Sequence, residues 1–245
     1  MKIIINPAYE RFSTFVNTIS ERFDKEGKSI YKSRNEIKVF DVAGTLLNVK
    51  QYKVPAFANR VIYSFFRPAK AFRAYDYALK LLAKGFDTPE PVAYILSYKG
   101  GLIHRTYFIS FQSSYPRNMY EFGEGVLVGR EHIIQSLGRY TARLHEANIY
   151  HHDYSPGNIL FNEADNDVSF CLIDINRMSF GAVSIKKGCA NFARLWGNEE
   201  MFHLLAYEYA KERNADIDEC KAWILNYRER FWEKYKKKHG MPFSL

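Results

Sequence analysis

The sequence lacks any long apolar run: no window approaches about eighteen uncharged apolar residues, the length that a membrane-spanning helix needs. The N-terminal stretch "MKIIINPAYERF" reaches Asn6 and Pro7 too soon for the apolar core of a signal peptide. We therefore expect an intracellular protein. Its 245 residues, 47% of them hydrophobic, suffice for one large domain or two small lobes and exclude a disordered chain.

Cysteine is also scarce. The three cysteines, Cys171, Cys189 and Cys220, are widely spaced and form no CxxC pair. This pattern argues against a disulfide framework and against a cysteine zinc site. We expect all three to be small buried side chains.

Acidic residues are fewer than basic ones, 27 against 35, which gives a net charge of +8. The charge indicates an anionic partner, but does not choose among nucleotide, nucleic acid, acidic glycan and membrane surface. The clearest basic cluster is "RERFWEKYKKKHG" at 228–240, which continues a helical pattern of Trp223, Tyr227, Phe231 and Tyr235. It predicts either a packed C-terminal helix with a solvated basic end or a contact with anionic lipid or lipid-linked glycan.

The first 112 residues predict a small sheet. After an opening strand, apolar spacing over 7–24 predicts a helix, and "AFRAYDYALKLLAK" at 71–84 predicts a second helix inserted into the sheet, which ends at Gly85. The expected strands alternate in polarity or flank turn residues, and cover 29–31, 37–42, 45–52, 92–98 and 102–112.

The rest of the chain is predicted to be mostly helical. In "EHIIQSLGRYTARLHEA" the residues Ile133, Ile134, Leu137, Tyr140 and Leu144 share one face, and Asn148 ends the helix. Two short strands are expected around "ILF" and "SFCLID", with helices after them.

The stretch "YHHDYSPGNILF" at 150–161 carries the chemistry. His151 and His152 are adjacent and point to opposite sides in extended backbone, which argues against a zinc site. Ser155 lacks the first glycine of a hydrolase nucleophile elbow. The spacing instead fits phosphoryl transfer: Asp153 is followed five residues later by Asn158 and, after a strand, by Asp174. In that reaction one carboxylate accepts a proton, and an amide and a second carboxylate hold Mg²⁺.

These residues resemble the HxDxxxxN and DFG elements of the protein-kinase-like superfamily. Four stretches in combination most resemble the lipopolysaccharide kinase family, the Kdo and core-heptose kinases of Gram-negative bacteria. They are "NVKQYK", "AYDYALKLLAKGFDTPEPVAYI", "LGRYTARLHEANIYHHDYSPGNILF" and "FCLIDINR". The motifs extend over about residues 29–180.

The resemblance implies roles for single residues. His151 would brace the catalytic loop, Asp153 would be the catalytic base, and Asn158 and Asp174 would bind the metal. Lys50, preferred over Lys53 from the strand alternation, would pair with the nucleotide's phosphates.

The sequence departs from the superfamily in several places. The helix partner of Lys50 would be Asp76, at a position where a glutamate is usual. The motif "DIN" replaces DFG: Ile175 stands in place of the phenylalanine ring, and Asn176 would accept the left-handed backbone of the glycine.

Two further positions rest on the resemblance alone. No GxGxxG exists, so the phosphate cover would be "KSRN", where Lys32 and Arg34 either bind phosphate or form a polar turn. The backbone of Phe111 and Gln112 would pair with adenine.

We therefore predict an α+β, two-lobe protein-kinase-like fold, with a mainly β N-terminal lobe holding one key helix (1–113) and an α-rich C-terminal lobe (114–245). The implied activity is phosphorylation of a sugar hydroxyl on the Kdo or heptose of lipid A-linked inner core, with ATP and Mg²⁺ as cofactors. The implied location is the cytoplasm, in peripheral contact with the inner membrane, with an anionic lipid-linked glycan and not nucleic acid as partner. The alternatives are a kinase of a soluble amine or sugar, and a pseudokinase that binds without turnover.

Overall fold

A computed structural model describes residues 1–124, 126–164 and 167–239 of the chain. It divides into two compact units, residues 1–114 and 115–245, each formed by one continuous segment of chain. The predicted strands and long helices are present in both units. The structure adds elements that the sequence did not predict, namely the helix α2 (Phe57–Phe65) and the short strands β7 (Arg117–Asn118), β8 (Ile149–His151) and β11 (Met178–Phe180).

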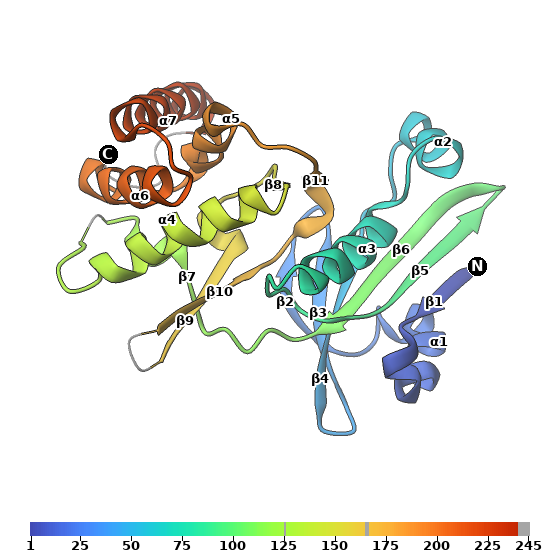
Figure 1. Cartoon of the computed structure of the whole chain (residues 1–245). Coiled ribbons are helices and arrows are strands. Elements are labelled where there is room, and N and C mark those ends of the chain that lie inside the picture. Colours follow the sequence, from blue (N-terminus) through green and yellow to red (C-terminus); the bar gives the residue numbers. More distant parts are fainter. Residues whose placement is uncertain (125, 165–166, 240–245) are drawn as a thin grey trace. The chain divides into compact units, whose positions relative to one another are not determined.

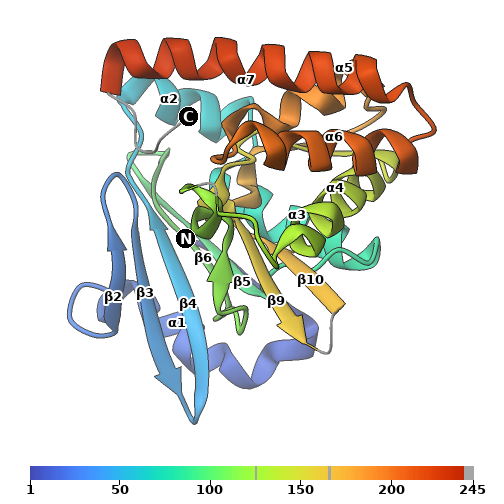
Figure 2. The same cartoon turned by 90° about the vertical axis from the view of Figure 1, so that its left-hand side faces the viewer.

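The first unit is built on a six-stranded antiparallel sheet with the order β1-β5-β6-β4-β3-β2. Its strands are β1 (Lys2–Ile5), β2 (Lys28–Lys32), β3 (Glu36–Val42), β4 (Thr45–Tyr52), β5 (Pro91–Lys99) and β6 (Leu102–Phe111). The three strands β2, β3 and β4 follow one another through short turns (Figure 2). Each strand that was predicted in this unit is present.

Helices cover both faces of this sheet (Figure 1). On one face η1 (Pro7–Phe12) and α1 (Ser13–Arg22) pack their apolar residues against Val49, Ile95 and Tyr107. On the other face α3 (Lys70–Ala83) packs against Tyr52 and Tyr94. Because successive residues of a strand point to opposite faces, the even-numbered residues of β4 belong to the α3 face.

The helix α2 (Phe57–Phe65) is the element of the first unit that the sequence analysis missed. The predicted N-terminal lobe had a single helix inserted in its sheet, whereas α2 and α3 both lie between β4 and β5. No residue of α2 is buried, so it lacks the inward apolar stripe by which sequence patterns reveal helices.

The second unit combines two small sheets with helices. A three-stranded sheet has the order β10-β9-β7 and a two-stranded one pairs β11 with β8. The strands are β7 (Arg117–Asn118), β8 (Ile149–His151), β9 (Ile159–Ala164), β10 (Asp167–Leu172) and β11 (Met178–Phe180). The helices are η2 (Met119–Phe122), α4 (Glu131–Glu146), η3 (Pro156–Asn158), η4 (Ile175–Arg177), α5 (Ile185–Cys189), η5 (Ala190–Arg194), α6 (Glu199–Glu212) and α7 (Ile217–His239).

The helix α4 buries the face that its sequence predicts, and the chain leaves it at Asn148 with a left-handed φ of 63°. It packs against α6, and α7 packs along α6 in turn (Figure 2). In α7 the fully buried residues are Cys220, Ile224 and Trp232, so the predicted stripe through Trp223 and its partners is only half-buried. Lys236, Lys237 and Lys238 are exposed, and Gly240 lies outside the described residues.

All three cysteines are free thiols and buried, as predicted. Among the described residues no helix combines the length and the apolar character that crossing a membrane requires.

Candidate active site

The loop after β8 places Asp153 between two arginines. Arg194 Nη1 lies 2.5 Å from Asp153 Oδ1, and Arg177 Nη1 lies 3.3 Å from Oδ2. The carboxylate is largely buried while both guanidinium groups are partly exposed. The pair of cations fixes the orientation of the carboxylate, because each oxygen has its own donor.

His151 connects this loop to the segment that precedes Asp174. The His151 ring is fully buried; its Nδ1 accepts a hydrogen bond from Asp153 N at 3.0 Å, and its Nε2 lies 3.1 Å from Ile173 O. Since Nδ1 accepts, Nε2 carries the proton and donates to the carbonyl, so the ring is neutral. Burial lowers the pKa of His151, which favours the same neutral form. The predicted role of His151 as a brace is confirmed.

A chain of buried hydrogen bonds ties the loop to the helices. Asn191 Nδ2 donates to His151 O at 2.8 Å, and Asn191 Oδ1 lies 2.9 Å from His145 Nε2. The other ring nitrogen of His145 lies 2.9 Å from the hydroxyl of Tyr209 on α6. His145 thus links α4 and α6 to η5, and through η5 to β8.

Asn158 ends the short helix η3 beneath the loop. Its Nδ2 donates to Asp153 O at 2.8 Å, which leaves its oxygen as the atom able to bind a cation. Its backbone carbonyl accepts from Ile173 N at 3.0 Å, so Asn158 is joined to the segment before Asp174 as well. Gly157 is needed here because a Cβ at this position would lie 2.6 Å from the ring of Tyr120.

Asp174 has a left-handed backbone, with φ 52° and ψ 40°. The prediction that Asn176 takes this conformation is wrong: Asn176 lies in η4, is buried, and donates from Nδ2 to Asp174 Oδ1 at 2.6 Å. Aspartate is among the few residues that tolerate this backbone, since its short side chain bonds locally. Ile175 is buried, in keeping with its predicted packing role.

The second unit thus joins Asp153, Asn158 and Ile173, the residue before Asp174, in one hydrogen-bonded assembly around His151. A carboxylate and an amide oxygen suit Mg²⁺, which commonly takes one or two protein ligands and completes its shell with phosphates and water. Among the described residues there is no group of three or more His, Cys, Asp or Glu able to hold a metal. A metal here would therefore depend on Asn158, Asp174 and the oxygens of the bound nucleotide.

Lys50 lies on β4 in the first unit, opposite Ile37 of β3 and close to the β2–β3 turn. Its ammonium lies 5.4 Å from the ring centroid of Tyr52, on the sheet face that α3 covers. Asp76 on α3 forms its ion pair with Lys80, one turn further on, at 2.7 Å. The pairing of Lys50 with Asp76 stays a prediction.

The "KSRN" turn joins β2 to β3 at the end of the sheet next to Lys50. Lys32 is exposed and lies 3.7 Å from Glu36, and Arg34 is exposed at the turn itself. Both cations are accessible from solvent, and their contact with phosphate stays a prediction.

The backbone N–H groups of Phe111 and Gln112 are engaged within the first unit. Phe111 N donates to Glu90 O at 3.0 Å, and Gln112 N donates to Leu46 O at 2.9 Å. Pairing of this backbone with adenine would therefore have to use carbonyl groups, and it stays a prediction.

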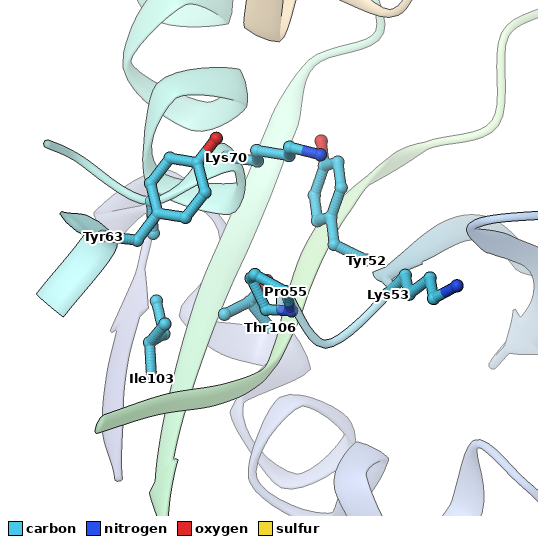
Figure 3. Close-up of a pocket in the computed structure, with 8 residues that line it drawn as sticks. Tyr52, Lys53, Pro55, Tyr63, Lys70, Ile103 and Thr106 are labelled. Carbon is cyan, nitrogen blue, oxygen red and sulfur yellow. The ribbon is translucent and has the colours of Figure 1, made fainter. Parts of the chain in front are cut away.

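A shallow pocket of the first unit lies between α2, the start of α3 and β6 (Figure 3). Its polar side chains are Tyr52, Lys53, Tyr63, Lys70 and Thr106. Lys70 reaches toward Tyr52, and Lys53 points away from the other lining side chains (Figure 3). None of the residues predicted for phosphoryl transfer lines this pocket.

Sequence reasoning missed Arg177, Arg194, His145 and Asn191. Arg177 follows "DIN" directly, and this proximity to Asp174 was the one available signal. Arg194 and Asn191 stand about 40 residues after the loop that they contact. No spacing rule connects positions that only the fold brings together.

Comparison with known proteins agrees with this geometry. A sequence model described as "Lipopolysaccharide kinase (Kdo/WaaP) family" matches residues 24–200, well over half of the chain. No curated protein sequence matches this chain.

A solved structure described as "WaaP in complex with acyl carrier protein" is similar over 96% of this chain and 99% of that one, with a TM-score of 0.66 and 15% sequence identity. At this identity the likeness shows a shared kinase-like fold.

Proposed function

Because the chain belongs to the lipopolysaccharide kinase (Kdo/WaaP) family, and is therefore a kinase that transfers a phosphoryl group to a sugar hydroxyl, we propose that its acceptor is the inner core of lipopolysaccharide. The acceptor hydroxyl would belong to Kdo or heptose linked to lipid A. The phosphoryl donor is ATP, as the family implies.

One observation carries the proposal: the bonds of His151 and Asn158 join Asp153 to the segment that leads into Asp174. Phosphoryl transfer depends mainly on positioning and charge neutralisation. An assembly that fixes a base and two metal ligands relative to one another supplies the positioning.

In the proposed reaction, the oxygen of the acceptor hydroxyl attacks the γ-phosphorus of ATP while Asp153 accepts the proton of that hydroxyl. The new O–P bond forms while the bond from the γ-phosphorus to the bridging oxygen breaks, and ADP leaves. Asn158 and Asp174 would hold Mg²⁺, which would supply positive charge to offset that of the phosphates. Lys50 would orient the α and β phosphates.

Arg194 and Arg177 extend this proposal. Both contact Asp153 and are partly exposed, so their remaining N–H groups face solvent. They position the base and place positive charge beside the acceptor, which suits an anionic sugar such as Kdo.

The two compact units would be the two lobes of one kinase-like domain. The protein would act at the cytoplasmic face of the inner membrane of a Gram-negative bacterium, where lipid-linked acceptors are found. Its net charge of +8 suits an anionic acceptor on an anionic surface.

A pseudokinase is the second candidate, and one observation favours it. Both oxygens of Asp153 are engaged by guanidinium groups, and Asp76 is engaged by Lys80. In this alternative the arginines keep Asp153 from acting as a base and the chain binds nucleotide without transfer.

The test is transfer of labelled γ-phosphate from ATP to purified lipid A precursor with and without Kdo. We expect labelling of the Kdo-bearing acceptor, its loss in Asp153→Asn, and no loss in the control Asp218→Asn on the exposed side of α7. Labelling that persists in Asp153→Asn contradicts the catalytic assignment.

Other outcomes separate the alternatives. Transfer to free Kdo or to an amine, unaffected by the lipid, favours a kinase of soluble molecules. Nucleotide binding without transfer to any acceptor favours the pseudokinase.

A further inference from the structure

The helix α2 exposes its apolar side. Phe57 is 71% exposed, Ile62 42%, Phe65 69% and Phe66, which caps the helix, 81%. Residues three or four apart share a side of a helix, so Ile62, Phe65 and Phe66 form one apolar face, here called the α2 face, and Phe57 is exposed separately at the start of the helix. A helix of a globular protein normally turns such a face toward the core.

The opposite side of α2 holds the helix to the sheet through polar bonds, beside Tyr63, which packs against the apolar cluster on the α3 face of the sheet. Arg60 donates from Nε to Ile103 O at 2.8 Å and from Nη2 to Lys99 O at 2.9 Å. Ser64 Oγ accepts from Ile103 N at 2.9 Å and donates to Arg60 O at 2.6 Å. This side is thus committed to the protein, and the outward orientation of the α2 face is fixed by specific bonds.

The chain around the α2 face is strongly basic. From Ala43 to Tyr75 the sequence contains six Lys or Arg residues and no Asp or Glu. Arg67, directly after Phe66, and Lys99, at the end of β5, are both exposed. An apolar face rich in phenylalanine with a basic rim has the composition of helices that lie in a lipid–water interface.

We propose that the α2 face docks on an anionic phospholipid bilayer, with its phenylalanines among the headgroups and upper acyl chains and Arg67 and Lys99 on lipid phosphates. Three apolar side chains on one short helix support reversible attachment. Docking on the membrane would serve the proposed function, on which the inference rests. The test of docking measures binding and requires no catalytic turnover.

Two observations favour lipid over a protein partner. The apolar side chains lie along one short helix without a buried residue, with high exposure at both its ends. The basic end of α7, the other candidate for membrane contact, has three exposed lysines, and among the residues described up to His239 no exposed large apolar side chain lies beside them.

Sedimentation of the full chain with vesicles tests the proposal. We expect binding to phosphatidylglycerol-containing vesicles and little binding to pure phosphatidylcholine. Phe65→Ser/Phe66→Ser should weaken binding at least about tenfold, because two large apolar side chains leave the lipid. Arg67→Gln should weaken it about fivefold, and less at high salt.

The matched control is Val126→Ser/Val128→Ser, since these residues of the second unit are 59% and 87% exposed. It should bind vesicles as the parent chain does. Equal losses in the two double variants would mean general surface hydrophobicity and would overturn the proposal.

A probe at the surface tests insertion directly. The native cysteines are all buried, so Phe66→Cys can be labelled selectively with an environment-sensitive dye. We expect a blue shift on anionic vesicles at position 66 and none for Val128→Cys. Asp153→Asn should leave vesicle binding intact, so a failed kinase assay and a failed docking assay are distinguishable.

Two results contradict the lipid assignment. A blue shift that grows with protein concentration in the absence of vesicles would assign the α2 face to a second copy of the chain. A shift induced by an acidic carrier protein but by no vesicle would assign it to a protein partner.

Discussion

At the scale of single residues, Asp153 is defined by its two arginines. Each guanidinium orients one oxygen of the carboxylate, with Arg194 the closer at 2.5 Å. We predict that Arg194→Ala lowers kcat about tenfold to a hundredfold with little change in the KM for ATP, because the base loses its orientation while the nucleotide site is untouched.

Steady-state kinetics with the Kdo-bearing acceptor measure this effect. Arg194→Lys should recover part of the rate, and the exposed Arg143→Ala should keep the parent rate. A rise in kcat on removal of Arg194 would favour the inhibitory reading of the two arginines.

Gly157 gives a second prediction at this scale. In Gly157→Ala the new Cβ meets the ring of Tyr120 at 2.6 Å, and relief of this overlap costs about 1–3 kcal/mol. We expect lower stability in urea unfolding and lower activity, because Asn158 is the next residue. The double variant Gly157→Ala/Tyr120→Ser should regain most of both, and no regain would mean that Gly157 acts otherwise.

The sequence offers signals for residues that stand close together along the chain, whose catalytic roles stay predictions, and none for residues that only the fold brings together. Asp153, Asn158 and Asp174 stand at spacings that phosphoryl transfer requires. Asn191 and Arg194 reach the loop only through η5. The wrong assignment of the left-handed backbone to Asn176 has a physical reason as well. Aspartate tolerates this backbone as asparagine does, so the sequence does not show whether Asp174 or Asn176 adopts it.

At the scale of elements, strands and helices with one buried face were predictable. Alternation gave β3 and β4, and spacing gave α3 and α4, since burial imposes each pattern. The helix α2 escaped because its apolar residues face outward between Pro55 and Pro68, in a segment that follows no inward pattern.

The attachment of α2 is testable. In Ser64→Ala the N–H of Ile103 loses its acceptor, which costs about 1–3 kcal/mol. We expect hydrogen exchange of the α2 amides to accelerate about fivefold to a hundredfold. The control is Ser97→Ala, which removes a similar bond to Arg105 N on the same sheet and should leave α2 exchange unchanged.

At the scale of the whole molecule, buried histidines make stability depend on pH. Burial lowers the pKa of His145 from 6.5 to about 4, and lowers that of His151. As pH falls below 6.5 the unfolded chain takes up protons at these sites and the folded chain does not, so unfolding is favoured. The free energy of unfolding lost through His145 reaches its full value of about 3 kcal/mol near pH 4.

Urea unfolding followed by tryptophan fluorescence measures this loss. Trp196, Trp223 and Trp232 all lie in the second unit, as do both histidines, so the signal reports the affected unit. His145→Gln, which keeps a donor and an acceptor but does not titrate, should flatten the pH dependence. The control His203→Gln on the surface should not, and equal slopes for all three proteins would contradict the assignment.

The order of strands in the first sheet has a consequence for biosynthesis. β1 is the edge strand and pairs with β5, whose residues leave the ribosome about 90 residues later. At ordinary translation rates this interval is roughly 5–20 s, during which the β1 segment has no partner strand in its own sheet. Its apolar "IIIN" therefore depends on chaperones or on the nascent η1 and α1 for protection, and replacing Ile4 with lysine should reduce aggregation during expression more than it changes the folded protein.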